Sequence, residues 1–319
     1  MRPDTLVVEI SGKRPGTSAQ RPTERFRVEH DHVIISNNAD DYITDWKIVM
    51  VPDDFREWYC EKYRHSDTAW YAPMNRSYAI KYARDHGYKY LVQLDDNIDS
   101  LHLESISTGK DGISKRYRAI DSVGMMDDFI EMLVCVLENT NAGMAGCGMA
   151  GCSNPTNDFL RERYVYSLFA LDLSICADIF HGDFEDDIEY RLKLGQMGIP
   201  AVQVVPLRYS KPGQVSSKDE TGNRAAYTAA GVKRGEHMRL LYGDKYKCGM
   251  RSRTNGTAGA TIAGTMYFKH ILTPWKVGVL VHDRDAMNRK LQEIYQKNAK
   301  PYADKYILRE KKVKNGKTT

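Results

Sequence analysis

The sequence has few cysteines and no arrangement of them that would bind zinc or form a disulfide framework. Its six cysteines are scattered, none forms a Cys-x-x-Cys pair, and none stands beside a histidine at zinc-like spacing. We therefore expect reduced thiols and a reducing, cytoplasmic compartment. No signal peptide is expected, because residues 1–4 lead directly into a predicted strand.

Long hydrophobic runs and familiar phosphate-binding loops are also missing. The longest apolar region, residues 258–281, is interrupted by two lysines, a histidine and a proline, so we expect no membrane span and no membrane partner. The chain lacks the spacing of a P-loop, a dinucleotide fingerprint and any internal repeat. With 42% hydrophobic and 28% charged residues, the composition is that of an ordinary globular protein.

The small excess of positive charge lies at one end of the chain. The formal net charge is +4, and the residues from Pro301 onward carry all of it, so the rest of the chain is balanced. A basic tail of this kind could contact the phosphates of a nucleic acid. A solvated terminus would have the same composition, and the sequence leaves both interpretations open.

The first hundred residues alternate short apolar segments with helical patterns. Each apolar segment ends in polar or turn residues, and Gly87 stands where a glycine commonly follows a helix. This strand–helix–strand rhythm predicts an α/β fold with a mostly parallel central sheet. The expected strands are residues 6–10, 33–35, 47–51 and the run from Tyr90, and the expected helices are residues 55–63 and 73–86.

The remaining residues predict further helices and strands around two polar stretches. We interpret residues 105–118 as a mobile loop, and residues 209–224 as a lid or substrate loop because of their length. Close backbone approach, to a ligand or to packed neighbours, would explain the glycine-rich run 142–151. Strands are expected at 164–173 and 200–206, and helices at 121–138, 187–197, 237–242 and 286–299.

Two clusters of acidic residues are the main candidates for chemistry. The first, Asp95-Asp96-Asn97-Ile98-Asp99, follows the apolar strand, so its carboxylates would reach the carboxyl edge of the sheet, where open α/β folds bind ligands. Mg²⁺ and Mn²⁺ prefer such oxygen ligands. An acidic turn would have a similar composition. We interpret Asp95, Asp96 and Asp99 as ligands of a divalent metal.

The second cluster, Asp183 to Glu189, opens a predicted helix. Acidic residues are favoured in a first helical turn by the helix dipole, which offers a purely structural explanation. Alternatively, Asp186 or Asp187 would be a general base at the edge of the sheet. Arg76 and Lys13 are candidates for contact with nucleotide phosphates. His237 is a candidate metal ligand, although a lone histidine is more often structural.

Taken together, these segments resemble a GT-A glycosyltransferase, and more narrowly the TET-associated glycosyltransferases of bacteriophages. The residues that carry the narrower resemblance are Trp70 to Ser77, Leu94 to Ile98 and Phe184 to Asp187, within roughly residues 5–215. Asn97 stands where the Asp-x-Asp motif of GT-A enzymes often has its last acid. This departure leaves open whether Asn97 or Asp99 completes the site.

The resemblance implies a Rossmann-like GT-A fold and an Mn²⁺- or Mg²⁺-dependent transferase that moves a hexose or pentose from a UDP-sugar. It further implies hydroxylated pyrimidines in phage DNA as the acceptor, in the host cytoplasm if a phage encodes the chain. By the same resemblance, Asp95 and Asp96 lie beside the nucleotide, and Asp187 or Asp186 is the base if the reaction inverts.

The predicted domain spans residues 1–245, with a nucleotide half at about 1–100 and an acceptor half at about 101–245. Residues 246–319 form a helical, basic extension.

Two other activities remain open at the level of sequence. The same fold could act on a protein or polysaccharide, and a sugar-phosphate nucleotidyltransferase also pairs carboxylates around Mg²⁺ at a sheet edge. The identity of the sugar, the stereochemical outcome and the oligomeric state are not determined by these patterns.

Overall fold

The computed structural model describes most of the chain. No helix in the described part is long and apolar enough to cross a membrane. All five cysteines in the described part are free thiols. The described residues are 2–12, 22–40, 42–63, 72–108, 114–120, 124–150, 160–162, 165–181, 186–211, 235–252, 266–273, 275 and 277–299.

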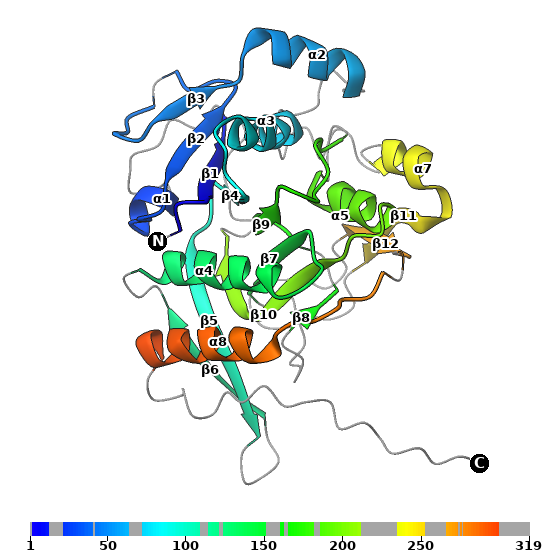
Figure 1. The fold of residues 1–319 in the computed structure, drawn as a ribbon. Coiled ribbons are helices and arrows are strands. Elements are labelled where there is room, and N and C mark those ends of the chain that lie inside the picture. Colours follow the sequence, from blue (N-terminus) through cyan, green and yellow to red (C-terminus); the bar gives the residue numbers. More distant parts are fainter. Residues whose placement is uncertain are drawn as a thin grey trace, which may run out of the picture.

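A single sheet of ten strands forms the centre of the molecule (Figure 1). Its order is β3-β2-β1-β4-β9-β7-β10-β5-β6, and β8 pairs with β10 at the side. The strands are β1 Thr5–Ser11, β2 His32–Ser36, β3 Ile48–Met50, β4 Tyr90–Asp95, β5 Ser100–Thr108, β6 Ser114–Ile120, β7 Met144–Met149, β8 Leu160–Arg161, β9 Leu168–Asp172 and β10 Ala201–Ser210.

The first four strands in space run parallel, as the sequence predicts. β1 pairs with β2 on one side and with β4 on the other, and β2 pairs with β3. Nearly continuous apolar residues in β1 and β4 suit strands that are covered on both faces. Because these strands are parallel, Ser11, Ser36 and Asp95 end at the same edge of the sheet.

One antiparallel strand interrupts the parallel strands at the centre of the sheet. β9 lies antiparallel between β4 and β7, and β10 then continues parallel to β7. Seven strands (β1, β2, β3, β4, β6, β7 and β10) therefore share one direction, and β5, β8 and β9 run the opposite way. The predicted α/β class is confirmed: the sheet is mixed, mostly parallel and flanked by helices.

Helices cover both faces of the sheet (Figure 1). One face packs against α4 (Met125–Glu138) and α8 (Arg284–Asn298), which lie side by side. The other face packs against α2 (Asp53–Tyr63), α3 (Ala72–Asp85) and α5 (Asp186–Gln196). A short helix, α1 (Pro22–Arg25), precedes β2. The predicted helices 55–63, 73–86, 121–138 and 187–197 are confirmed within a few residues.

One predicted loop is largely a pair of strands, and most of another lies outside the described residues: of residues 209–224, Tyr209 and Ser210 belong to β10, and 212–224 are not described. Of residues 105–118, interpreted as a mobile loop, 105–108 and 114–118 belong to the antiparallel strands β5 and β6, and 109–113 lie outside the described residues. The prediction was wrong because it relied on the polar, basic composition of this stretch. It gave too little weight to the alternation of apolar and polar residues at Ser100–Glu104, which is typical of a strand. β10 continues to Ser210, four residues beyond the predicted end, through an irregularity between Val204 and Arg208 that accommodates Pro206.

The C-terminal part contributes to the main core as well as to a small sheet of its own. α7 (Glu236–Tyr242) and the 3-10 turn Gly243–Lys245 lead into the hairpin β11 (Tyr246–Ser252) and β12 (Met266–Leu272). The predicted helices 237–242 and 286–299 are confirmed. α8 of the predicted extension buries Leu291 and Tyr295 against the same core as α4.

Packed neighbours explain the glycine-rich run that forms β7. A Cβ added at Gly146 would lie 2.0 Å from Val165 Cγ1, and one at Gly148 would lie 1.9 Å from the Arg208 Nη1 atom. Both positions therefore require the absence of a side chain, so that β9 and the buried Arg208 can approach the strand. These glycines are needed for packing within the sheet.

Gly146→Ala should lower the free energy of unfolding by about 1–3 kcal/mol, because the added methyl group would overlap Val165 and lie 3.0 Å from the Leu168 carbonyl. Gly249→Ala is the matched control, since a Cβ there meets nothing within 4 Å. Urea unfolding of the two variants measures the difference. Equal stabilities would contradict the packing explanation.

A buried histidine ties the start of β2 to α4. His30 Nδ1 lies 2.6 Å from Asp127 Oδ1, and its Nε2 lies 3.2 Å from Glu131 Oε1, while the imidazole is fully buried. Burial by itself lowers the pKa of His30, but the two carboxylates raise it to about 9 overall. Arg2 bonds Glu131 from the other side, at 3.0 Å. His30 is therefore a buried cation at neutral pH.

Stability should depend on pH through this histidine. Because its folded-state pKa is raised above the unfolded value, its contribution is complete below about pH 6.5 and is lost as the pH rises through 9. We expect the free energy of unfolding to fall by roughly 3 kcal/mol between pH 6 and pH 10. His30→Gln should be less stable at pH 6 and should lack this decline. A variant with the decline of the natural protein would contradict the assignment.

Candidate functional site

The acidic end of β4 lies at the edge of the sheet where β1 and β2 also end. β4 is flanked by β1 and by the antiparallel β9, so Asp95 is held between two ladders. The Asp95 backbone N–H donates to the Ser167 carbonyl at 3.0 Å, which continues the β4–β9 pairing by one residue. The Asp99 N–H donates to the Ser210 carbonyl at the end of β10, at 2.8 Å. The loop after β4 is thus fixed at both ends.

Two side-chain cations meet at the carboxylate of Asp95. Arg76 from α3 donates through Nη2 to one carboxylate oxygen, and Lys211, the first residue after β10, donates through Nζ to the other. Burial by itself raises the pKa of Asp95, but Lys211 and Arg76 lower it to well below its usual range. The carboxylate is therefore ionised, with both oxygens engaged by cations.

Arg76 also joins the two acidic clusters that lie far apart in the sequence. Its Nε donates to Asp186 Oδ2 at 2.6 Å, and its Nη1 donates to Gln93 Oε1 at 3.3 Å. The arginine side chain is only 4% exposed. Burial lowers the pKa of this arginine, whereas Asp95, Asp186 and Asp187 raise it by a larger amount. The structure thus brings Asp95, Arg76 and Asp186 together, although the bridging position of Arg76 was not anticipated.

The two carboxylates that open α5 differ in their surroundings. Asp186 is buried, and burial raises its pKa, while Arg76 opposes and Asp95 reinforces the rise. Asp187 is half-buried in the first helical turn. Glu189, also in the first turn, is fully buried and accepts hydrogen bonds from the Tyr242 hydroxyl and from the His181 backbone N–H. Glu189 therefore anchors the helix, while Asp187 is the less enclosed carboxylate.

A polar cluster surrounds Asp96 at the ends of β1 and β2. The Ser11 hydroxyl donates to Asp96 Oδ2 at 2.8 Å and lies 2.7 Å from the Tyr42 hydroxyl. Asn75 Nδ2 donates to the Ser11 carbonyl at 3.2 Å and to Asn37 Oδ1 at 3.1 Å. Within the described part of the chain, the buried Asn75 Oδ1 accepts no hydrogen bond. The cluster can therefore still accept a hydrogen bond from a ligand.

The last carboxylate of the strand end, Asp99, faces solvent. Its side chain is 60% exposed, and its Oδ1 lies 3.8 Å from the Arg25 Nη1 atom. Arg25 also donates to the Ile98 carbonyl at 2.7 Å, so α1 supports this loop. The neighbouring Asn97 Oδ1 is buried and has no hydrogen-bond partner among the described residues.

The arrangement fits the predicted metal site only in part. Among the described residues, no group of three or more His, Cys, Asp or Glu side chains is arranged to hold a metal ion. Asp95 does not fit, because both its oxygens accept from cations. Asp96 and Asp99 fit better, since Mg²⁺ often binds one or two carboxylates together with substrate phosphates. The roles of these residues as metal ligands remain predictions.

Two predicted site residues cannot be placed beside this cluster. Lys13 lies outside the described residues. His237 belongs to α7, but its side chain also lies outside the description, so its role as a metal ligand remains a prediction. The helix itself is near α5, because Tyr242 of α7 bonds Glu189.

Sequence reasoning missed two residues that shape the site. Lys211 was read only as part of a polar loop, although its place directly after a strand could have indicated the edge of the sheet. Ser167 has a left-handed φ of 50°, and the Leu168 N–H donates to the Tyr166 carbonyl across it. This γ-turn with positive φ is a strained conformation, and no pattern in the neighbouring sequence predicts it. The turn leads the chain into β9, and the Ser167 carbonyl accepts the hydrogen bond from the Asp95 backbone N–H.

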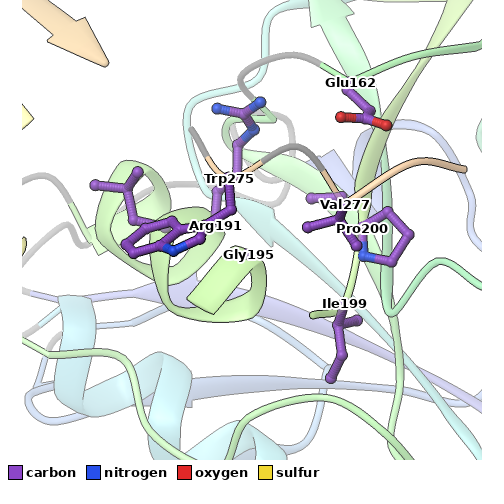
Figure 2. A pocket seen from close by; sticks show the side chains of 9 residues that line it. Glu162, Arg191, Gly195, Ile199, Pro200, Trp275 and Val277 are labelled. Atoms are coloured by element: carbon purple, nitrogen blue, oxygen red, sulfur yellow. The ribbon is translucent and has the colours of Figure 1, made fainter. Parts of the chain in front are cut away.

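The pocket in Figure 2 lies elsewhere. Its lining residues come from α5, from the segment that opens β10 and from the residues around Trp275, so it lies at the amino end of β10, opposite the edge that carries Asp95. The cavity is about 20 Å³, enough for a water molecule and too small for a nucleotide. The residues that line it are Glu162, Arg191, Leu192, Gly195, Ile199, Pro200, Ala201, Trp275 and Val277.

Comparisons with known proteins add little to this geometry. No protein-family model matches the sequence, and no curated protein matches it. A provisionally assigned nucleotide-diphospho-sugar transferase from Desulfovibrio desulfuricans G20 is 11% identical, with 76% of this chain and 99% of that chain covered and a TM-score of 0.33. Mannosyl-3-phosphoglycerate synthase from Rubrobacter xylanophilus is 9% identical, with 84% of each chain covered and a TM-score of 0.36. Similarity this low transfers no activity to the chain, so its function has to be inferred from its own residues.

Arg76→Met should lower the free energy of unfolding by about 3–5 kcal/mol at pH 7, because it leaves the buried Asp186 carboxylate without its cation. The loss should shrink as the pH falls, since the pKa of Asp186 is already raised and its carboxyl group can take up a proton. Arg56→Met, which breaks the exposed Arg56–Asp53 pair, should cost less than about 0.5 kcal/mol. Denaturant unfolding at several pH values compares them. A loss for Arg76→Met as small as that of the control would contradict the buried-bridge role.

Proposed function

We propose that this protein is a GT-A glycosyltransferase that moves a sugar from a nucleotide donor, UDP in the first instance, to a hydroxylated pyrimidine base in phage DNA. The observation that carries the proposal is the meeting of two acidic clusters through Arg76 at the carboxyl edge of a mostly parallel sheet. One cluster ends a central strand and the other opens a helix. A transferase needs such an arrangement, with donor phosphates on one side and an acceptor hydroxyl on the other.

The donor nucleotide would bind at the ends of β1 and β2. Ser11, Asn37 and Asn75 already form a network with Asp96 there, and Asn75 Oδ1 is an acceptor without a protein partner in the described part. Nucleotides bind at this edge in open α/β sheets because the strand ends and the following loops form a crevice. The half of the chain predicted to bind the nucleotide supplies all four residues.

Asp96 and Asp99 would hold a divalent ion together with the phosphates of the donor. When bound, Mn²⁺ or Mg²⁺ would offset the negative charge that builds on the departing diphosphate. Asp96 is kept in place by the Ser11 hydroxyl, and Asp99 by the backbone bond to Ser210 and the nearby Arg25. Asp95 would contribute by holding the side chains of Arg76 and Lys211 in position.

Asp187 would accept the proton of the acceptor hydroxyl if the reaction inverts the anomeric carbon. Of the two candidates, Asp186 is buried and bonded to Arg76, whereas Asp187 is half-buried in the first turn of α5. A general base has to reach its proton within hydrogen-bond distance, which favours the less enclosed carboxylate. Asp186 would then fix the start of the helix through Arg76.

The DNA acceptor rests on the resemblance to the TET-associated glycosyltransferases and on the basic end of the chain. A base within a duplex would have to leave the stack to reach Asp187, at a cost of roughly a few kcal/mol. Single-stranded DNA avoids this cost, so it should be modified faster than duplex DNA of the same sequence. Protein or polysaccharide acceptors would need no such step.

Nucleotide release tests the proposal directly. The protein is incubated with Mn²⁺, a panel of UDP-sugars, and DNA with or without 5-hydroxymethylpyrimidines. We expect UDP to appear only with hydroxylated DNA, together with a hexose or pentose mass shift on the digested nucleosides. Release of UDP without modification of DNA would retain the transferase and remove the DNA acceptor.

Variants of the two carboxylates provide the controls for this assay. Asp96→Ala and Asp187→Asn should each lower turnover by about 100-fold or more, because they remove charge or basicity at the reacting groups, while thermal unfolding stays close to that of the natural protein. Asp53→Ala, at an exposed aspartate of α2, should leave turnover unchanged. Full activity of Asp96→Ala would remove the proposed metal site.

A further inference from the structure

The second cation at Asp95, Lys211, differs from Arg76 in its surroundings. Arg76 is enclosed, with 4% of its side chain exposed, and it shares its single positive charge between Asp95 and Asp186. Lys211 contacts the other oxygen of the same Asp95 carboxylate, with 18% of its side chain exposed. Lys211 therefore supplies a second positive charge beside these two carboxylates and is the more accessible of the two cations.

Lys211 is placed beside the loop that carries the other acidic residues. It follows Ser210, whose carbonyl accepts the Asp99 backbone N–H at 2.8 Å, so the end of β10 and the Asp96–Asp99 loop are joined directly. Ser210 also pairs with Ser100 in the β10–β5 ladder. These contacts hold the backbone of Lys211 at the same edge as Ser11 and Asp96.

The ammonium group retains hydrogen-bonding capacity toward a ligand. A lysine ammonium has three donors, and among the described residues Asp95 is the one partner of Lys211. Arg76, by contrast, donates to Asp186, Gln93 and Asp95 and is enclosed. A flexible lysine held by one carboxylate can turn toward a phosphate oxygen without leaving the site, whereas the buried guanidinium cannot.

We propose that Lys211, held in place by Asp95, is a binding residue for the diphosphate group of a nucleoside diphosphate at this edge of the sheet. The inference rests on the proposed function, which places the donor nucleotide beside Asp96. It assigns Asp95 the role of a counter-ion for Lys211 and Arg76, where the sequence predicted a metal ligand. A charge-assisted contact from Lys211 to a phosphate adds affinity that does not depend on a divalent ion.

The test measures the binding of UDP and of uridine to the full chain by titration calorimetry and ligand-observed NMR, in EDTA and in Mn²⁺. Lys211→Met should weaken UDP binding by roughly 10- to 100-fold in EDTA, the range expected for a lost hydrogen bond to a charged group. Uridine, which has no phosphates, should bind both proteins equally. Lys211→Arg should retain part of the affinity for UDP.

Lys81→Met is the matched control, because it breaks a lysine–aspartate pair of similar length on the exposed side of α3, with 54% of each side chain exposed. It should leave UDP binding unchanged. Two results would overturn the proposal and keep the donor site: unchanged UDP binding by Lys211→Met, or an equal loss of UDP and uridine, which would mean that Lys211 only supports Asp95. If the natural protein binds UDP in neither EDTA nor Mn²⁺, both this proposal and the proposed UDP donor are excluded.

Discussion

The buried guanidinium of Arg76 is the interaction on which the arrangement of the site depends. It connects α3, the end of β4 and the start of α5 through Asp95 and Asp186. Each of these carboxylates would be costly to bury alone, and each is stabilised because the arginine supplies charge and directed hydrogen bonds together. One side chain therefore determines both where the acidic strand end lies and where the helix with Asp187 begins.

The central sheet supplies the geometry that this interaction requires. Parallel β1, β2 and β4 bring Ser11, Ser36 and Asp95 to one edge, and the reversed β9 closes the other side of β4. The strained turn at Ser167 leads into β9 and pairs with the backbone of Asp95. Strain of this kind persists only where the surroundings enforce it. The position of Asp95 is therefore set by backbone and side chain alike.

Much of the fold could be predicted from the sequence, because apolar strands and amphipathic helices have distinct periods. The early strands, the helix 73–86 and the helix over Met125–Glu138 follow these periods closely. The hairpin β5–β6 could not be separated from a loop, since each of its strands gains its hydrogen bonds from the partner strand. The extension of β10 to Ser210 was missed because its hydrogen bonds also come from partner strands. Pro206 in addition suggested that the strand ended there.

The sequence by itself determined the α/β class, the acidic strand end and the acidic start of α5, because these depend on local pattern. Only the tertiary structure decided which charged side chains pair with one another. Arg76 and Asp186 are separated by 110 positions, and Lys211 and Asp95 by 116, so no local rule could pair them. The sequence suggested a metal at Asp95, whereas the folded chain places two side-chain cations there. Burial is the physical reason, since a carboxylate taken from water requires the nearest positive charge that the fold can supply.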